Sequence, residues 1–413
     1  MQHDFFRLLS PADFTALLQQ FPPTGCQAVD LPQALGRVAA CDLRAPEDLP
    51  LANRSCMDGY AVRARDLFGA SQGAPAYLEC VGSLAIDQAP GFTLQPGACV
   101  AIPTGGTLPD GADAVAMVEY THELGGGAIE IYKSLAPAEN VMLKAEDAAQ
   151  GQIVIACGAR LRSQEIGLLA GLGITRLEVY AAPRVGILST GDELVPPEQK
   201  PRPGQIRDVN SIALACLAAE AGGLPTQYGI VPDDFDSLAA ALAAALDAND
   251  LVLISGGSSI GTRDLTLATL ESLPDCRVLA HGVAISPGKP TILASVAGKP
   301  VLGLPGQVTS AQIVMLVFGQ PLLRQLAGER GCFDPARRST RPALLAQNLS
   351  SKPGREDYVR VRLETLPNGQ QNAWPLTGKS GLLKTLVQAQ GLICVPATRE
   401  GLLAGTTVEV WTL

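Results

Sequence analysis

Between residues 183 and 327, short apolar runs alternate regularly with longer segments whose hydrophobic positions follow a helical period. The apolar runs predict strands at 185–189, 228–231, 251–254, 278–285, 292–295 and 301–302. The longer segments predict helices at 211–221, 234–246, 264–273 and 309–326. Alternating strands and helices are typical of a doubly wound parallel sheet. The pattern therefore predicts an α/β domain over residues 181–330.

The rest of the hydrophobic pattern predicts a multidomain chain around this α/β domain. Residues 54–142 consist of short alternating runs separated by glycine and proline, which predict a small β module. The residues on either side, 1–53 and 143–180, share a mixed helical character. We expect them to form one discontinuous domain into which the β module is inserted. Residues 336–413 alternate again with little helix and predict a small β-barrel.

Composition and charge narrow the functional classes. With 413 residues, of which 47% are hydrophobic, the chain is expected to contain two to four domains. The formal net charge is −9 without any lysine- or arginine-rich run, which argues against a nucleic-acid-binding groove. No apolar run reaches the ~20 residues of a membrane span, and the first residues do not resemble a signal peptide. The ten cysteines are scattered without a C-x-x-C pair, as is typical of reduced thiols in a cytoplasmic protein.

Glycine-rich loops lie at or near four of the predicted strand ends, at 189–193, 255–261, 287–290 and 303–306. In an open parallel sheet, ligands bind beyond the C-terminal ends of the strands. Glycine lets the backbone approach a phosphate and direct N–H groups toward it. One such loop alone is most often a plain turn, but four at one edge favour a site for an anionic, phosphate-bearing ligand. The candidate contacts are Thr190, Gly191, Ser255, Gly256, Gly257 and Gly306.

Each charged residue near these loops has both a functional and a purely structural explanation. Lys289 is a candidate point charge on a phosphate, and a solvated surface lysine is its plain alternative. Oxygen ligands for Mg²⁺ are available from Asp192, Glu193 and Asp264. Helix N-capping competes with a functional role at the acidic residues that precede predicted helices, which are Asp208, Asp233, Asp234 and Asp264. In the same way, Ser10 predicts the start of a helix over residues 10–20.

Standard catalytic motifs are absent. The three histidines do not support a Ser/His/Asp triad, and neither the Walker A pattern nor the dinucleotide fingerprint occurs. The β module contains two unusual turns, one at Asp58–Gly59 and one at Thr104 within residues 103–106. Composition alone explains both turns as structural.

Eight motifs, spread over nearly the whole chain, resemble those of the molybdopterin molybdenumtransferases, a family related to the E domain of gephyrin. They include Met57-Asp58-Gly59-Tyr60-Ala61-Val62 and Ser189-Thr190-Gly191-Asp192-Glu193-Leu194. The others lie at 103–105, 146–147, 204–210, 255–257, 287–290 and 303–306, and all occur in family order. The resemblance implies four domains and an elongated homodimer.

The resemblance also implies an activity. Members of the family insert molybdate into adenylylated molybdopterin in the presence of Mg²⁺, release AMP and form molybdenum cofactor. By analogy, Glu193 and Asp264 are the functional acids of the sheet domain and Lys289 is an anion contact. Asp58, Thr104 and Asp147 are the other half of the site, contributed across the dimer. Further substrate contacts are implied at Asp233, Ser310 and Arg355, and a contact with the adenylyltransferase of the pathway is a further expectation.

The chain departs from the family at three positions. Many members have Asn-Pro-Val-Ser where this chain has residues 307–310, beginning with Gln307, and many have a lysine at the position of Ser286. Leu382 stands where other members have serine. Three alternatives to molybdate insertion stay open. They are insertion of tungstate, a non-catalytic molybdopterin-binding scaffold, and the related adenylyltransferase activity.

Overall fold

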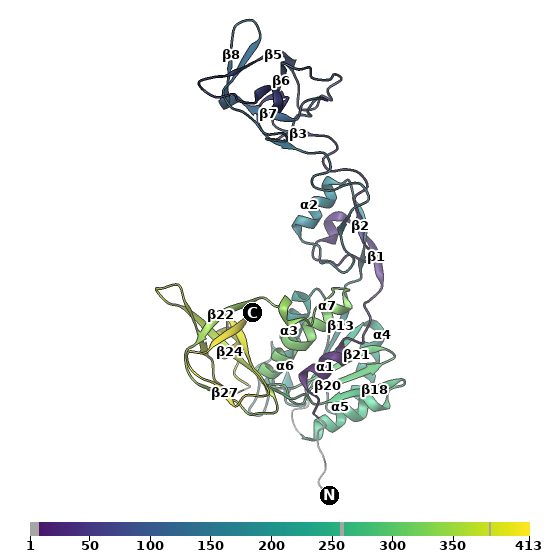
Figure 1. The fold of residues 1–413 in the computed structure, drawn as a ribbon. Helices are drawn as coiled ribbons and strands as arrows, with labels where there is room; N and C mark the ends of the chain where they lie inside the picture. The colour runs from purple at the N-terminus through teal and green to yellow at the C-terminus, as the bar shows by residue number, and fades with distance from the viewer. Residues whose placement is uncertain (1–7, 257–259, 380) are drawn as a thin grey trace.

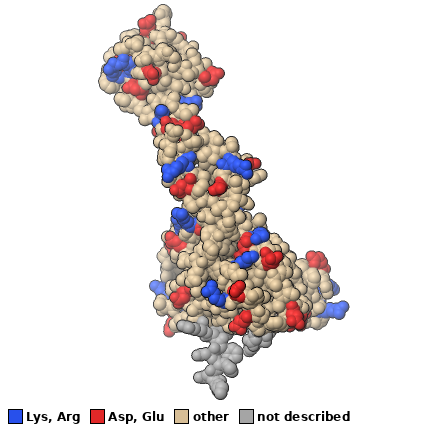
Figure 2. Space-filling model, turned by 90° about the vertical axis from the view of Figure 1, so that its right-hand side faces the viewer, with Lys and Arg blue, Asp and Glu red and all other residues tan. Residues whose placement is uncertain are grey.

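The computed structural model describes residues 8–256, 260–379 and 381–413; for residues 260–264 it describes the backbone only. The chain is elongated (Figure 1): the β module lies at one end, a small mixed domain in the middle, and the α/β domain and C-terminal barrel side by side at the other end. Figure 2 shows the same outline, with acidic and basic side chains interspersed over the visible face. Within the described residues, no helix combines the length and apolar character that crossing a membrane requires.

The sheet of the α/β domain has six strands in the order β16–β13–β17–β21–β20–β18. Their bounds, in that order, are Leu224–Val231, Arg184–Thr190, Leu251–Gly256, Lys299–Leu304, Ile292–Val296 and Cys276–His281. The first four strands run parallel, whereas β20 is antiparallel to both of its neighbours. Ala297 and Gly298 explain this direction, because both have positive φ angles and form a two-residue hairpin turn. The doubly wound α/β fold is confirmed, and its sheet is mixed.

Helices cover both faces of this sheet. They are α3 (Asn210–Glu220), α4 (Phe235–Ala248), α5 (Ile260–Ser272) and a helical run formed by α6 (Val308–Val314), a π-helical segment (Met315–Gly319) and α7 (Gln320–Leu326). Successive strand residues point to opposite faces. Ile187 therefore packs with α3 and the helical run, while Leu188 packs with α4 and α5. The predicted start of α5 was wrong: Asp264 lies inside the helix, so it is not an N-cap.

Helix α1 (Pro11–Leu18) begins where the sequence predicts, because the Ser10 hydroxyl accepts a hydrogen bond from the Asp13 N–H at 3.1 Å. Its location differs from the expectation that it belongs to the discontinuous domain. Phe14 and Leu18 are fully buried in the core of the α/β domain. The Phe14 ring lies edge-on to Phe318, with ring centroids 4.9 Å apart. Burial of these large apolar side chains explains why the helix packs there.

The middle domain is assembled from chain segments on both sides of the β module. Strand β1 (Cys26–Asp30) pairs antiparallel with β12 (Arg176–Tyr180), and β2 (Leu43–Arg44) pairs with β11 (Ile153–Ile155). Helix α2 (Ser163–Gly171) shares a buried apolar cluster with these strands. One small core therefore ties together residues that are more than a hundred positions apart in the sequence.

An ion pair at the start of α2 gives a prediction about pH. Hydrogen bonds from the Arg162 side chain lower the pKa of Glu165 to about 2, with Arg162 Nη2 2.6 Å from Glu165 Oε1. A lowered folded-state pKa stabilises the fold at pH values above the unfolded pKa, and this contribution disappears as the pH falls toward 2. Arg162→Gln is expected to raise the Glu165 pKa in an NMR titration and to cost about 0.5 kcal/mol at neutral pH. Arg176→Gln is the control, because Arg176 is exposed and forms no ion pair among the described residues. An unchanged Glu165 pKa in Arg162→Gln would contradict the conclusion that Arg162 lowers this pKa.

The β module and the barrel are separate sheets at opposite ends of the molecule (Figure 1). The module has the strand order β7–β4–β6–β5–β9–β8, with bounds Ala114–Met117, Gly59–Val62, Ala98–Ile102, Ala76–Ser83, Ala128–Ile131 and Thr121–Glu123. The expected C-terminal barrel is confirmed as a closed ring of β24 (Glu356–Thr365), β25 (Gln371–Pro375), β22 (Thr340–Leu345), β28 (Thr407–Thr412) and β26 (Gly391–Val395).

A short strand joins the barrel to the α/β domain. The strand predicted over 278–285 is divided into β18 and a separate strand, β19 (Ile285–Ser286). Strand β19 adds to the barrel sheet by pairing parallel with β24, with Ser286 opposite Asp357. The Glu356 N–H also donates to the Ala284 carbonyl at 2.9 Å. Backbone hydrogen bonds therefore cross the boundary between the two domains.

Candidate functional site

The glycine-rich loops meet at one edge of the sheet. Strands β13 and β17 end side by side, with Thr190 opposite Gly256, and β21 ends beside them, with Ser255 opposite Leu304. Strand β20 runs in the opposite direction, so its first residue, Ile292, lies next to Gly303. The loop at 287–290 consequently reaches the same edge. The fold thus brings together loops that are separated by more than a hundred residues in the sequence.

Two glycines are required for the close approach of these loops. Gly256 has a φ angle of +155°, and a Cβ atom there would lie 2.2 Å from the Thr190 carbonyl oxygen. Gly191 has a φ angle of +151°, and a Cβ atom would lie 2.8 Å from a carboxylate oxygen of Glu193. At Gly256 the added atom would collide with the Thr190 backbone, whereas at Gly191 the exposed Glu193 side chain could move away. At both positions a side chain would also strain its own backbone.

Gly256→Ala is therefore expected to destabilise the protein by about 2–3 kcal/mol, because the clash with the Thr190 backbone cannot relax by side-chain rotation. Thermal unfolding followed by circular dichroism measures the loss. Gly204→Ala is the matched control: Gly204 has a φ angle of +93° but open space around it, so only about 1 kcal/mol is expected. Equal losses of stability in the two variants would show that the close packing of the loops adds nothing to the cost of the Gly256→Ala substitution.

Thr190, Asp192 and Asp233 form a connected polar group. The Thr190 hydroxyl donates to Asp233 Oδ1 at 2.5 Å, and the Asp233 N–H donates to Asp192 Oδ1 at 3.1 Å. The neighbouring Asp234 caps α4 by accepting from the Ser237 N–H at 2.9 Å. Helix capping therefore explains the position of Asp234, whereas the Asp233 side chain hydrogen-bonds to Thr190 at the end of β13.

Asn210, the first residue of α3, links two of the loops, a role that the sequence does not reveal. Its Nδ2 donates to Ser255 Oγ at 2.6 Å and to the Gly306 carbonyl at 2.9 Å. Its Oδ1 is buried and accepts no hydrogen bond from any residue that the structure describes. Asp208, in contrast, caps α3 by accepting from the Ser211 N–H at 3.1 Å. The buried oxygen of Asn210 is therefore an acceptor available to a bound ligand.

A cavity of about 340 Å³ opens beside this group. Its polar lining consists of Thr190, Glu193, Arg207, Asp208, Asn210, Ser255 and Gln307, with glycines at 256, 306 and 381. Glu193 is exposed, and within the described part of the chain its carboxylate accepts no hydrogen bond. Arg207 donates to the Pro197 carbonyl at 2.8 Å and was not singled out by the sequence analysis. The cavity therefore offers carboxylate, guanidinium, hydroxyl and amide groups to one ligand.

The remaining candidates of the sheet domain do not line this cavity. Lys289 is exposed in the loop at 287–290, and Ser310 is buried inside α6. In the barrel, Arg355 directly precedes β24 and does not line the cavity; its Nε lies 2.8 Å from Asp357 Oδ1. Gly257 and the side chain of Asp264 lie outside the described residues. At the family departures, Gln307 precedes α6 without a side-chain cap, and Leu382 is exposed.

A second polar group lies in the β module. The Thr104 N–H and hydroxyl both donate to Asp58 Oδ1, at 2.7 and 3.0 Å. These hydrogen bonds, led by the backbone N–H of Thr104, lower the pKa of Asp58. Asp58 also borders an open cavity of about 370 Å³. Asp147 is exposed in the loop after β10 (Val141–Met142) and, among the described residues, its side chain makes no hydrogen bond or ion pair with Asp58.

The two polar groups lie far apart within one chain. Figure 1 places the β module, with β3 (Arg54–Ser55) and β4, at the opposite end of the molecule from β13 and β21. The middle domain separates them. One chain therefore does not bring Asp58 and Glu193 to a common ligand in this conformation.

Models of three family regions match the chain in sequence order. The MoeA N-terminal region (domain I and II) matches residues 9–173. The probable molybdopterin binding domain matches residues 186–325, and the MoeA C-terminal region (domain IV) matches residues 342–413. The match to the molybdopterin binding domain covers the residues that line the cavity beside Asn210, except Gly381.

Full-length relatives agree with these matches. A molybdopterin molybdenumtransferase of a Nostoc species is 34% identical over 93% of this chain and 88% of its own length. Molybdopterin molybdenumtransferase 2 of Mycobacterium tuberculosis is 35% identical over 94% of this chain and 96% of its own length. A crystal structure of the molybdopterin biosynthesis MoeA protein of Pyrococcus horikoshii, 36% identical, superimposes with a TM-score of 0.78 over 98% of this chain and 99% of that chain. The chain belongs to the MoeA family of molybdopterin biosynthesis proteins.

Proposed function

We propose that this protein is a molybdopterin molybdenumtransferase, which inserts molybdate into adenylylated molybdopterin and releases AMP. The observation that carries the proposal is the cavity beside Asn210, because its polar groups converge within the matched molybdopterin binding domain. Two full-length relatives carry the name of this activity. The glycine loops, with Ser255 and Thr190, would bind the phosphate oxygens through N–H and O–H groups. The buried Asn210 Oδ1 would accept a hydrogen bond from an N–H or O–H of the substrate.

The residues at this cavity fit a magnesium ion. The Glu193 carboxylate has no hydrogen-bond donor among the residues that the structure describes, and Mg²⁺ is commonly held by one or two carboxylates together with substrate phosphates. Glu193, Asp192 and Asp264 would hold the ion. Bound Mg²⁺ would offset the negative charge on the oxygens of the phosphate bond that breaks when AMP leaves. Arg207 and Lys289 would add positive charge for the anionic substrate.

We further propose that the active protein is a homodimer in which the β module of one subunit faces the sheet domain of the other. The separation of the Asp58–Thr104 pair from the cavity within one chain supports this arrangement. Because Thr104 lowers its pKa, Asp58 stays ionised at neutral pH. Its carboxylate would position a water molecule or the metal ion and would not contact the oxyanion directly. Asp147 would belong to the same half of the site. A cytoplasmic location and a contact with the pathway's adenylyltransferase complete the proposal.

An assay of AMP release from adenylylated molybdopterin with Mg²⁺ tests this function. Parallel reactions with molybdate and tungstate measure the oxyanion preference. AMP release with either oxyanion is the expected result. Binding of molybdopterin without AMP release would instead identify a scaffold, and adenylylation of molybdopterin by ATP would identify an adenylyltransferase.

A further inference from the structure

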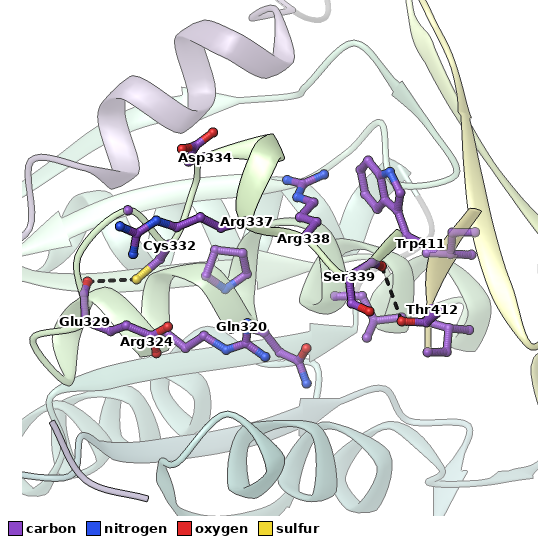
Figure 3. Close-up of a pocket in the computed structure, with 15 residues that line it drawn as sticks. Gln320, Arg324, Glu329, Cys332, Asp334, Arg337, Arg338, Ser339, Trp411 and Thr412 are labelled. Atoms are coloured by element: carbon purple, nitrogen blue, oxygen red, sulfur yellow. Dashed lines mark hydrogen bonds between the residues drawn. The ribbon is translucent and has the colours of Figure 1, made fainter. Parts of the chain in front are cut away.

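A second cavity, of about 290 Å³, lies at the seam between α7 and the C-terminal barrel (Figure 3). Arg324 of α7, Arg337 and Arg338 of the connecting segment, and Trp411 of β28 line it. Val308, which lines the candidate active site, begins the helical run that contains Arg324. At about 1.5 Å per residue, Val308 lies roughly 24 Å from Arg324 and roughly 12 Å from Leu316, the residue of this run nearest to Val308 that lines the second cavity. No residue lines both cavities. The second cavity is therefore a separate site.

The segment that connects α7 to the barrel is unusually basic. Residues 324–341 contain five arginines and two acidic residues, in a chain of net charge −9. Both acidic residues already have partners. Glu329 Oε2 accepts from Arg160 Nε at 3.0 Å and from Arg160 Nη2 at 2.9 Å, and the Asp334 carboxylate accepts from the Ala336 N–H at 2.9 Å. Both carboxylates line the cavity. Glu329 is already paired with Arg160, so of these two only Asp334 is left to offset the charge of the three arginines.

The three arginines of the cavity are held in different ways. The Arg338 guanidinium carbon lies 3.9 Å from the centre of the Trp411 ring, and burial lowers its pKa. Arg337 donates through Nη1 to the Arg330 carbonyl at 2.7 Å, whereas Arg324 is exposed. Throughout the described ranges, none of these three guanidinium groups forms an ion pair. Arg338 is half-buried against Trp411 and, among the described residues, has no carboxylate partner, which favours an anion from outside the chain. The exposed Arg324 and Arg337 add positive charge around it.

Figure 3 shows how these charges are distributed. Arg338 lies beside Trp411, Arg337 points toward the side of Cys332, and Arg324 lies near Gln320. The three guanidinium groups occupy different sides of the cavity and do not converge on one point. This spacing suits a ligand whose anionic groups are several ångströms apart, and it does not suit one simple ion.

We propose that this cavity binds a small polyanion with two or more separated anionic groups, either an oligophosphate or a polycarboxylate. Both classes present oxygen atoms that accept paired hydrogen bonds from a guanidinium group. The tryptophan under Arg338 fixes the plane of that guanidinium before the ligand arrives, which lowers the entropic cost of binding. This inference stands apart from the proposed enzymatic function, because neither the cavity nor its arginines overlap the candidate active site.

Trp411 is a built-in reporter for the test. The chain has two tryptophans, so Trp374→Phe leaves Trp411 as the only indole. In this background at low salt, pyrophosphate, tripolyphosphate and citrate are titrated separately while Trp411 fluorescence is followed, and calorimetry gives the stoichiometry. A saturable change in Trp411 fluorescence with at least one probe is expected, together with one calorimetric site per chain that persists in Arg207→Gln. The probe that binds more tightly distinguishes an oligophosphate site from a polycarboxylate site.

Charge-removing variants locate the binding. Arg324→Gln and Arg338→Gln are each expected to weaken the affinity roughly tenfold, as loss of a charged hydrogen bond does. Arg341→Gln is the matched control, since Arg341 belongs to the same segment but does not line the cavity, and Arg207→Gln controls for binding at the candidate active site. Both controls are expected to bind normally. Arg324 is exposed, so its variant is expected to fold even if Arg338→Gln is destabilised.

Three results would overturn the proposal. The first is the absence of saturable binding with all three probes. The second is unchanged affinity in both Arg324→Gln and Arg338→Gln. The third is an equal loss in Arg341→Gln or Arg207→Gln, which would indicate general charge attraction or binding at the other cavity.

Discussion

Glu193→Ala is expected to lower the rate of AMP release at least about 100-fold, which is the scale on which a positioned acid, base or metal ligand contributes to catalysis. Glu193 is exposed at the cavity and, within the described residues, its carboxylate accepts no hydrogen bond. Its removal should therefore leave the fold intact. The rate constant is measured with saturating adenylylated molybdopterin, Mg²⁺ and molybdate, and the folded state is checked by thermal unfolding.

Glu198→Ala is the matched control for this variant. Glu198 is an exposed glutamate of the same connecting segment and does not line the cavity. Its replacement removes the same charge and should leave the rate of AMP release unchanged. Near-normal turnover of Glu193→Ala would remove this carboxylate from the mechanism, whereas equal losses in both variants would indicate a general charge effect.

The second large effect concerns subunit complementation. Asp58→Ala and Glu193→Ala homodimers are each expected to be inactive. If each site combines the β module of one subunit with the sheet domain of the other, a mixed dimer contains one intact site and one doubly defective site. Purified mixed dimers should then recover about half of the native activity, as two-fold symmetry requires. Co-expression of the two variants with different affinity tags, followed by sequential purification, supplies this species.

A mixed dimer of Asp58→Ala and Thr104→Ala is the control, because both changes affect the same half of the site. Each composite site then carries one defect, and activity should stay low. Recovery in the control would point to subunit exchange during the assay. Failure of the Asp58→Ala and Glu193→Ala pair to recover, despite a stable dimer by light scattering, would contradict the shared site.

Much of the fold follows from local signals in the sequence. The alternation of apolar runs with helical segments identifies the α/β domain, and Ser10 and Asp234 cap helices where their residue types predict. The docking of α1 could not be predicted in this way. The short helix is amphipathic, but which core it covers depends on the contact of Phe14 with Phe318, more than three hundred residues later. Similarly, the direction of β20 depends on a turn at Ala297–Gly298 that lacks a strong sequence signature.

The candidate site was only partly accessible from the sequence. The loop glycines and Glu193 stand out through residue type and position. Asn210 does not stand out in the sequence, because its bonds to Ser255 and Gly306 exist only once two distant loops meet the start of α3. The pairing of Asp58 with Thr104 likewise joins residues 46 positions apart through side-chain geometry. Such convergence depends on strand register, which local patterns do not specify.

The two-residue strand β19 has a consequence for how this protein can be divided. Its backbone pairs with β24, and its Ile285 side chain is fully buried. A fragment that ends before the barrel would leave the edge of β19 unpaired and would uncover the apolar surface of the α/β core that Trp411 and Leu392 of the barrel now cover. Unpaired strand edges promote aggregation. The α/β domain and the barrel are therefore best regarded as one unit of folding, and evolution could not exchange the barrel without also redesigning the loop that carries Lys289.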